Sequence, residues 1–235
     1  MKIFLTLLLV LATQAQATPT QEVVGRSVAI LTSRLNQIGS GVILDRGILL
    51  TNFHVLIERV NEPLTIKTED GRHFSIFPHQ HLVPHQALAY DGSNDYAFAL
   101  FEDPQALGPQ TPVRITELSP SSELTLPGWF GNLFSSSETN LFEKRGPMIL
   151  HCNHTQNGYS GSPVFDQHGA LVALNRGGIE EDHPFCPDQT LTAYSLQAKY
   201  IFATVSRLIP EIMPFLERSF FPKPKSSHSC KLDHC

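Results

Sequence analysis

The sequence has little charge, and the charge it has is weakly acidic. Only 17% of its 235 residues are charged, and 17 lysines and arginines stand against 22 aspartates and glutamates, which leaves a net charge of −5. Proteins that bind nucleic acid usually carry a basic stripe or patch, and no basic stripe occurs along this sequence. We therefore expect no nucleic-acid partner.

Long apolar runs are also missing, except at the start. Residues 3–12 are apolar, Lys2 precedes them, and the small residues Ala15 and Ala17 follow. Such a run is short for a membrane span, and its flanks are typical of a secretory signal peptide. We predict a signal peptide at 1–17, with cleavage before Thr18, export to the periplasm or the exterior, and no membrane attachment afterwards. A short N-terminal anchor is the alternative.

Helical patterns are scarce as well. The 17 prolines and 15 glycines are spread at turn-like spacing between short Val, Ile, Leu and Phe runs, which favours an all-β barrel or sandwich. The exception is segment 197–209, where Ile201, Val205 and Leu208 have helical spacing before Pro210. Residues 218–235 are rich in Lys, Ser and Pro, and we expect a flexible tail there. Nothing in the sequence indicates an oligomeric state.

Cysteine is rare, but its positions matter in an exported chain. Disulfides persist in oxidising compartments, and four cysteines allow three pairings: Cys152, Cys186, Cys230 and Cys235. The tail also holds His228 and His234 beside two of these cysteines. This short span is cramped for four ligands around a tetrahedral metal, so we predict no metal site.

The most informative segment is 157–165, with the sequence NGYSGSPVF. It places Ser160 in a glycine-bounded turn before an apolar strand, which suits a nucleophile because a serine hydroxyl reacts poorly unless it is exposed and aimed. Gly158 allows the backbone to approach a substrate carbonyl. The N–H groups of Gly158 and Ser160 can then converge to form an oxyanion hole. A plain hairpin turn is the alternative interpretation.

A serine nucleophile needs a base and a group that orients the base. His54 follows an apolar strand pattern that begins at residue 47, and a second strand pattern at 39–44 predicts a hairpin that carries this histidine at its end. Asp95 precedes the apolar run 96–101, whose side chains would half-bury its carboxylate. The alternatives are a structural histidine and an aspartate that caps a strand.

The order His54, Asp95, Ser160 and the motifs around them resemble the chymotrypsin-like serine proteases, in their bacterial trypsin-like branch. The matching segments are 50–55, 94–100 and 158–165, and the resemblance covers about residues 24–205. It implies an all-β fold of two six-stranded antiparallel β-barrels with a C-terminal helix. We expect a protease domain at 18–217, with the first barrel at about 24–103, a linker at about 104–122, the second barrel at about 123–196 and the helix at about 197–209.

The resemblance implies a serine endopeptidase that hydrolyses polypeptide substrates through a covalent acyl-enzyme, without a metal or another cofactor. Ser160 would attack the carbonyl, His54 would act as the base, and Asp95 would orient His54. The alternative is a catalytically inert binding module with the same barrels. Binding alone requires none of these three residues, which argues against that alternative.

In its second half the sequence is similar to the bacterial glutamyl endopeptidases. Thr155 lies where those enzymes carry a pocket threonine, whereas Asn175 replaces their pocket histidine. Arg176 could compensate for that loss toward an acidic substrate, but we expect a lone arginine to face solvent. The resemblance places the rest of the substrate-pocket wall at Thr192, Ala193, Tyr194 and Ser195.

The resemblance also bears on the cysteines and on activation. Many chymotrypsin-like proteases join the regions before and after the serine, which favours a Cys152–Cys186 disulfide. Cys230 and Cys235 would then pair in the tail, or one of them would bond to a partner. Closing the first loop would contribute roughly 3–4 kcal/mol. Trypsin-type zymogens bury a new N-terminus against an aspartate just before the serine. This chain has Tyr159 there, so we predict no activation of that kind.

Overall fold

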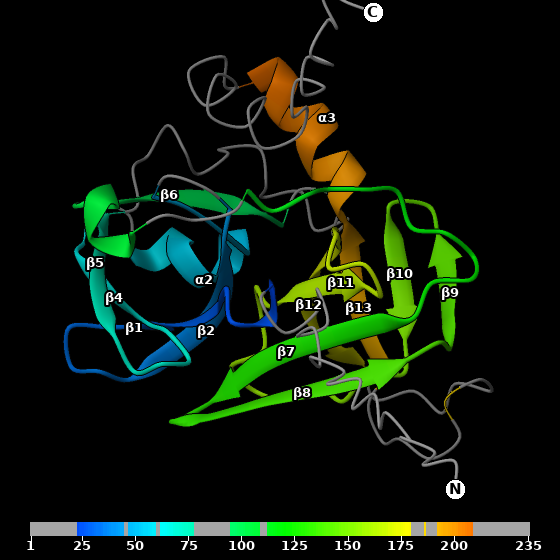
Figure 1. Ribbon diagram of the computed structural model, residues 1–235, viewed down its shortest axis with the longest axis horizontal. Coiled ribbons are helices and arrows are strands. Elements are labelled where there is room, and N and C mark those ends of the chain that lie inside the picture. The colour runs from blue at the N-terminus through cyan, green and yellow to red at the C-terminus, as the bar shows by residue number, and fades with distance from the viewer. Residues whose placement is uncertain are drawn as a thin grey trace, which may run out of the picture.

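Figure 1 shows a computed structural model of the protein, in which residues 23–44, 47–59, 62–77, 95–108, 112–179, 186 and 192–208 are described. The predicted signal peptide at 1–17, the tail at 218–235 and the cysteines Cys230 and Cys235 lie outside these residues and stay predictions.

The first half of the chain forms a closed barrel of six antiparallel strands, on the left of Figure 1. Its strands are β1 (Ser27–Leu31), β2 (Gln37–Ile43), β3 (Ile48–Thr51), β4 (Leu64–Lys67), β5 (His73–Phe77) and β6 (Ala97–Phe101). Apolar side chains such as Ile30, Leu49 and Ile66 are buried in one core cluster of this barrel. The order around the barrel is β1-β2-β3-β6-β5-β4, so β3 lies beside β6, with Thr51 opposite Ala97.

The second half is one antiparallel sheet of seven strands, with the order β8-β7-β11-β12-β13-β10-β9. The strands are β7 (Leu124–Phe130), β8 (Leu133–Thr139), β9 (Phe142–Arg145), β10 (Met148–His151), β11 (Pro163–Asp166), β12 (Leu171–Ile179) and β13 (Thr192–Gln197). The predicted all-β fold is confirmed, but the prediction of a second closed six-stranded barrel is wrong. The edge strands β8 and β9 are not paired with each other, and most of their side chains are exposed or half-buried.

The two halves share a hydrophobic core, which fixes one against the other. Val42 and Phe98 of the barrel belong to the same buried cluster as Phe165, Leu174 and Leu196 of the sheet. Backbone contacts also cross between the halves, since the Ser40 N–H donates to the Ser160 carbonyl at 2.7 Å. The candidate residues of the two halves therefore meet across a packed boundary.

Helices are few in the described part of the chain. The predicted C-terminal helix is present as α3 (Ala198–Leu208), and its residue Ile201 packs into the shared core. Short helical segments also occur at α2 (Phe53–Leu56) and in 3-10 turns at Ile57–Arg59 and Pro104–Leu107, and residues 23–24 are helical. None of the helices in the described ranges has the length and apolar character that crossing a membrane requires.

Candidate active site

His54 and Asp95 lie at the same end of the barrel, because β3 and β6 are antiparallel neighbours and the end of β3 lies beside the start of β6. His54 is the second residue of α2, which begins two residues after β3 ends, and Asp95 lies two residues before β6. The His54 Nδ1 atom lies 2.8 Å from Asp95 Oδ2, and the His54 backbone N–H donates to Asp95 Oδ1 at 3.1 Å. The imidazole remains 45% exposed, so its other nitrogen is open to a reacting group.

Asp95 is a buried carboxylate that is held in its charged form. Burial alone would raise its pKa, but the hydrogen bonds and charge of His54, together with the charge of Arg176, outweigh burial and lower the pKa of Asp95. The Asn52 side chain fixes the same residue by donating to the Asp95 carbonyl at 2.8 Å. An anionic carboxylate on Nδ1 sets the tautomer of the imidazole and stabilises its protonated form.

Arg176 is a further partner of Asp95, and it comes from the opposite half of the molecule. Its Nε atom lies 3.0 Å from Asp95 Oδ2, and its guanidinium lies over the Tyr194 ring at 5.5 Å from the ring centroid. The expectation that Arg176 faces solvent is wrong, because its side chain is only 22% exposed. Local sequence pattern gives no signal for this contact, since the two residues are far apart in the chain.

Ser160 lies in a tight turn between the barrel and the sheet. The turn requires glycine on both sides: Gly158 and Gly161 have φ angles of 94° and 87°, which disfavour any other residue. Ser160 is half-buried, and its hydroxyl donates to the Arg176 carbonyl at 3.0 Å. Arg176 therefore contacts Asp95 with its side chain and Ser160 with its backbone, and it joins the two parts of the candidate triad. No hydrogen bond links Ser160 to His54 within the described residues.

The turn also presents two backbone donors. Within the described ranges, neither the Gly158 N–H nor the Ser160 N–H has an acceptor in the protein, whereas the next N–H, of Gly161, donates to Asn175 at 2.8 Å. Two side chains of β2 hold the Gly158 carbonyl, with Ser40 Oγ at 2.7 Å and Gln37 Nε2 at 3.1 Å. Sequence reasoning missed both, because a serine and a glutamine in a strand carry no signal of a distant partner.

Tyr159 is buried against strands β7 and β8 of the sheet. It is 1% exposed, its ring packs directly on Gly128, and its hydroxyl is hydrogen-bonded to the Ser135 side chain. A Cβ atom at position 128 would overlap the ring, so glycine is required there. The residue before the serine is therefore held by β7 and β8, and no carboxylate occupies its place.

The structure brings the candidate pocket residues together but covers most of them. Pairing of β12 with β13 sets Asn175 opposite Ser195, with Thr192, Ala193 and Tyr194 opposite the residues that follow Arg176. The Asn175 amide donates to Thr155 Oγ1 at 3.3 Å and to the Tyr159 carbonyl at 2.9 Å. Tyr194 is half-buried, and the other five residues are buried: Thr155, Asn175, Thr192, Ala193 and Ser195.

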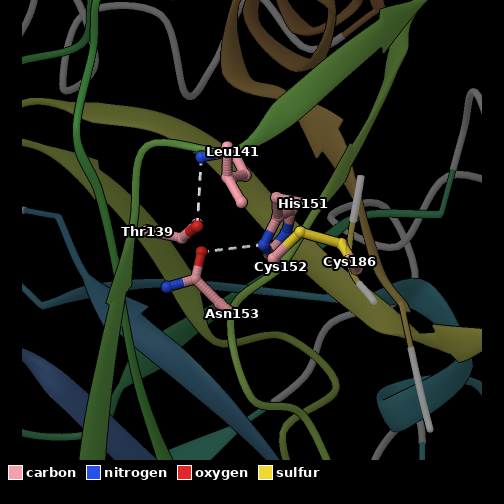
Figure 2. Close-up of a disulfide and its surroundings, with 6 residues drawn as sticks. All are labelled: Thr139, Leu141, His151, Cys152, Asn153 and Cys186. Atoms are coloured by element: carbon pink, nitrogen blue, oxygen red, sulfur yellow. Dashed lines mark hydrogen bonds between the residues drawn. A yellow bond between two sulfur atoms is a disulfide. The ribbon is translucent and has the colours of Figure 1, made fainter. Parts of the chain in front are cut away.

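A second histidine–serine contact lies beneath this wall and has a different character. His151 Nε2 is hydrogen-bonded to Ser195 Oγ at 2.7 Å, and its Nδ1 to Asn153 Oδ1 at 2.8 Å, as Figure 2 shows for Asn153. Both His151 and Ser195 are fully buried, and burial lowers the pKa of His151 to about 4. A substrate cannot reach this pair, so we interpret it as a support of the pocket wall. Sequence reasoning gave His151 no role.

The predicted disulfide between Cys152 and Cys186 is confirmed (Figure 2). Cys152 directly follows His151, so the disulfide joins the end of β10 to the segment before β13. In the part of the chain that the structure describes, no three His, Cys, Asp or Glu side chains lie close enough to hold a metal ion. The candidate groups are the His54–Asp95 pair, the Ser160 hydroxyl that Arg176 links to this pair, and two backbone donors, a set that would suit acyl transfer.

Similar sequences and folds occur among known peptidases. Residues 39–174 match the family model of the trypsin-like peptidase domain, a span that contains His54, Asp95 and Ser160 but not Ser195. A glutamyl endopeptidase of Staphylococcus aureus strain MW2 is 25% identical over 157 residues, which cover 62% of this chain and 48% of that protein. The corresponding enzyme of strain MRSA252 is 25% identical over 154 residues, covering 60% and 43%. This chain spans about half the length of these curated relatives.

Solved structures show the same fold at lower identity. The HtrA-type protease AlgW with a decapeptide has a TM-score of 0.60 and 13% identity, and the match covers 83% of this chain and 67% of that chain. The serine protease of a human pathogenic astrovirus has a TM-score of 0.52 and 18% identity, with coverage of 74% and 90%. At these identities the similarity concerns the fold alone.

Proposed function

Because this chain belongs to the trypsin-like peptidase family, we propose that it is a serine endopeptidase that hydrolyses polypeptides through His54, Asp95 and Ser160. The observation that carries the proposal is the His54–Asp95 pair, with Nδ1 and Oδ2 2.8 Å apart, in one site with a glycine-bounded serine turn. Arg176 contacts both Asp95 and Ser160, which supports a common site. The resemblance to glutamyl endopeptidases over more than half of the chain points to the same reaction.

In the proposed mechanism, the Ser160 hydroxyl turns from the Arg176 carbonyl toward His54 as a substrate binds. His54 takes the hydroxyl proton while Ser160 Oγ attacks the scissile carbonyl, and Asp95 stabilises the imidazolium that forms. The N–H groups of Gly158 and Ser160 donate to the oxyanion of the tetrahedral intermediate. His54 then gives the proton to the leaving amine as the peptide C–N bond breaks. In the second half, His54 takes a proton from a water molecule that attacks the acyl carbonyl, and returns it to Ser160 Oγ as the bond between Oγ and the acyl group breaks.

Replacing Ser160 by alanine tests this proposal. We expect Ser160→Ala to lose at least about a thousandfold in peptide turnover and all labelling by a fluorophosphonate probe, because only a nucleophilic serine reacts with that probe. Ser119→Ala, at an exposed serine on the chain that leads into β7, serves as the control and should keep both. Labelling that persists in Ser160→Ala would contradict the assignment. No labelling of the unmodified protein would favour the inert binding module.

We also propose that the protein is exported. The N-terminal segment has the order of a signal peptide, and the Cys152–Cys186 disulfide suits an oxidising compartment outside the cytoplasm. Sequencing the N-terminus of protein recovered from the periplasm or medium tests this, with Thr18 expected as the first residue. Recovery of the full-length chain in the cytoplasm, with reduced cysteines, would contradict it.

A further inference from the structure

A hollow of about 370 Å³ lies beside the serine turn, between the β1–β2 turn and the β7–β8 turn. We call it the hairpin pocket, and define it by Leu35, Gln37, Phe130, Asn132, Asn157 and Gly158. Each half of the molecule contributes one hairpin tip to it, and the residues Asn157 and Gly158 complete its inner wall. The pocket therefore reaches the same Gly158 whose N–H is a candidate oxyanion donor.

The outer wall of the hairpin pocket is apolar and unusually exposed. Leu35, in the β1–β2 turn, is 59% exposed, and Phe130, at the end of β7, is 49% exposed, although both are large apolar residues. Leu35 also has a φ angle of 60°, a conformation in which glycine or asparagine is the usual residue. A strained, exposed leucine opposite an exposed aromatic ring indicates a contact surface rather than a simple turn.

The position of the hairpin pocket relative to Ser160 determines which residues of a bound substrate can contact the pocket. On one side of the serine turn lies β12, where Gly161 and Ser160 donate to the carbonyls of Asn175 and Arg176. Beyond Arg176, β12 pairs with β13 along one edge only, within the described residues, so its other edge is open to a substrate strand. The hairpin pocket meets the turn earlier, at Asn157 and Gly158, where Gln37 of β2 holds the Gly158 carbonyl. A chain that runs along β12 to Ser160 would continue into the pocket.

We propose that the hairpin pocket binds an apolar side chain of the substrate on the leaving-group side, within the first two residues after the cleaved bond. This inference rests on the proposed peptidase function and adds a substrate preference to it. Leu35 and Phe130 bury the incoming side chain between them, and removal of their apolar surface from water supplies the selectivity. Gly158 couples the pocket to the oxyanion hole, so that occupancy of the pocket aligns the scissile carbonyl.

Cleavage of a proteome-derived peptide library, followed by mass spectrometry of the new amino termini, tests the proposal. Such a library presents every residue type on the acyl side, so cleavage is detected whatever the acyl-side preference is. We expect Leu, Phe, Ile or Met to exceed Asp and Gly in one of the first two positions by about tenfold, the discrimination typical of an apolar pocket. Phe130→Asn and Leu35→Asn should reduce this excess to about twofold or less, and asparagine also suits the φ angle at position 35.

Leu141→Asn is the matched control, because Leu141 is 48% exposed and does not line the hairpin pocket. It should keep the excess of apolar residues. Cleavage without any apolar excess, or an excess that survives both pocket variants, would overturn the inference and leave the peptidase proposal intact. A library in which no peptide is cleaved would overturn both.

Discussion

At the scale of single residues, the most consequential contact is the ion pair between Asp95 and Arg176. Oδ2 of Asp95 meets His54 Nδ1 at 2.8 Å and Arg176 Nε at 3.0 Å, while Oδ1 accepts the His54 N–H. A carboxylate with a 9% exposed side chain is expensive to bury unless it has such partners. Arg176 therefore stabilises the charged Asp95 and ties the barrel to the sheet at the site itself.

Arg176→Met should destabilise the protein by about 2–3 kcal/mol, because it leaves Asp95 without its cation while methionine still covers Tyr194. The loss stays below that of a fully broken buried pair, since the two His54 donors remain. Urea unfolding at neutral pH measures it. Arg59→Met is the control: both side chains of the Arg59–Glu62 pair are exposed, so its loss should stay within about 0.5 kcal/mol. Equal losses in the two variants would count against a role for Arg176 in holding Asp95.

At the scale of elements, β2 holds the serine turn from the opposite half of the molecule. The Ser40 N–H donates to the Ser160 carbonyl and Ser40 Oγ donates to the Gly158 carbonyl, both at 2.7 Å. The Thr51 hydroxyl in turn donates to the Ser40 carbonyl at 2.6 Å, so β3 supports β2. Strands of the barrel thereby hold the peptide that follows Gly158, which supports the position of the Gly158 N–H.

Ser40→Ala removes one of the two side-chain donors to the Gly158 carbonyl and leaves Gln37 Nε2 in place. We expect kcat to fall by roughly 10- to 100-fold with little change in KM, because small displacements of groups that act in the transition state are costly there. Steady-state kinetics on a peptide substrate provides the measurement, and circular dichroism confirms that the fold is kept. Ser119→Ala should leave both constants unchanged. A rise in KM at constant kcat would instead indicate that Ser40 shapes substrate binding.

At the scale of the whole molecule, the sequence predicted features that lie within short segments, but it did not predict contacts between distant residues. Short sequence patterns predicted the serine turn, the histidine after a strand and the C-terminal helix. The Cys152–Cys186 pairing followed from family resemblance. The Arg176–Asp95 pair and the Ser40–Gly158 contact join residues far apart in the chain, so no local pattern could reveal them. The open second sheet was missed because the resemblance implied a closed barrel, and whether the two edge strands β8 and β9 pair is a long-range property that no local pattern shows.

The disulfide should contribute substantially to global stability. Cys152 and Cys186 are 34 residues apart, and closing a loop of that length stabilises the fold by about 4 kcal/mol through the entropy of the unfolded chain. We expect the double variant Cys152→Ser and Cys186→Ser to lose most of this amount in urea unfolding. The matched double variant Cys230→Ser and Cys235→Ser should lose much less, because the sequence places these cysteines outside the protease domain. Comparable losses would show that the tail is part of the cooperative unit.

The buried His151 should make the stability of the whole molecule depend on pH. Burial lowers its pKa to about 4, whereas a histidine in an unfolded chain titrates near about 6.5. The unfolded chain therefore takes up the proton first as the pH falls. The stabilising contribution of neutral His151 is complete above about pH 6.5 and is lost progressively between about pH 6.5 and 4, by an amount on the order of 3 kcal/mol.

Urea unfolding of the wild-type protein and of His151→Gln at pH 7.0 and at pH 4.5 tests this prediction. Glutamine can still bond to Asn153 and Ser195 but cannot titrate, so the loss of stability between the two pH values should be smaller in the variant by roughly 2–3 kcal/mol. An equal loss in both proteins would mean that His151 does not govern the acid sensitivity. Because Ser195 also bonds to Asn175 at 3.5 Å, protonation of His151 should disturb the pocket wall before the fold is lost. We therefore expect peptide KM to rise with falling pH in the wild-type protein more steeply than in His151→Gln.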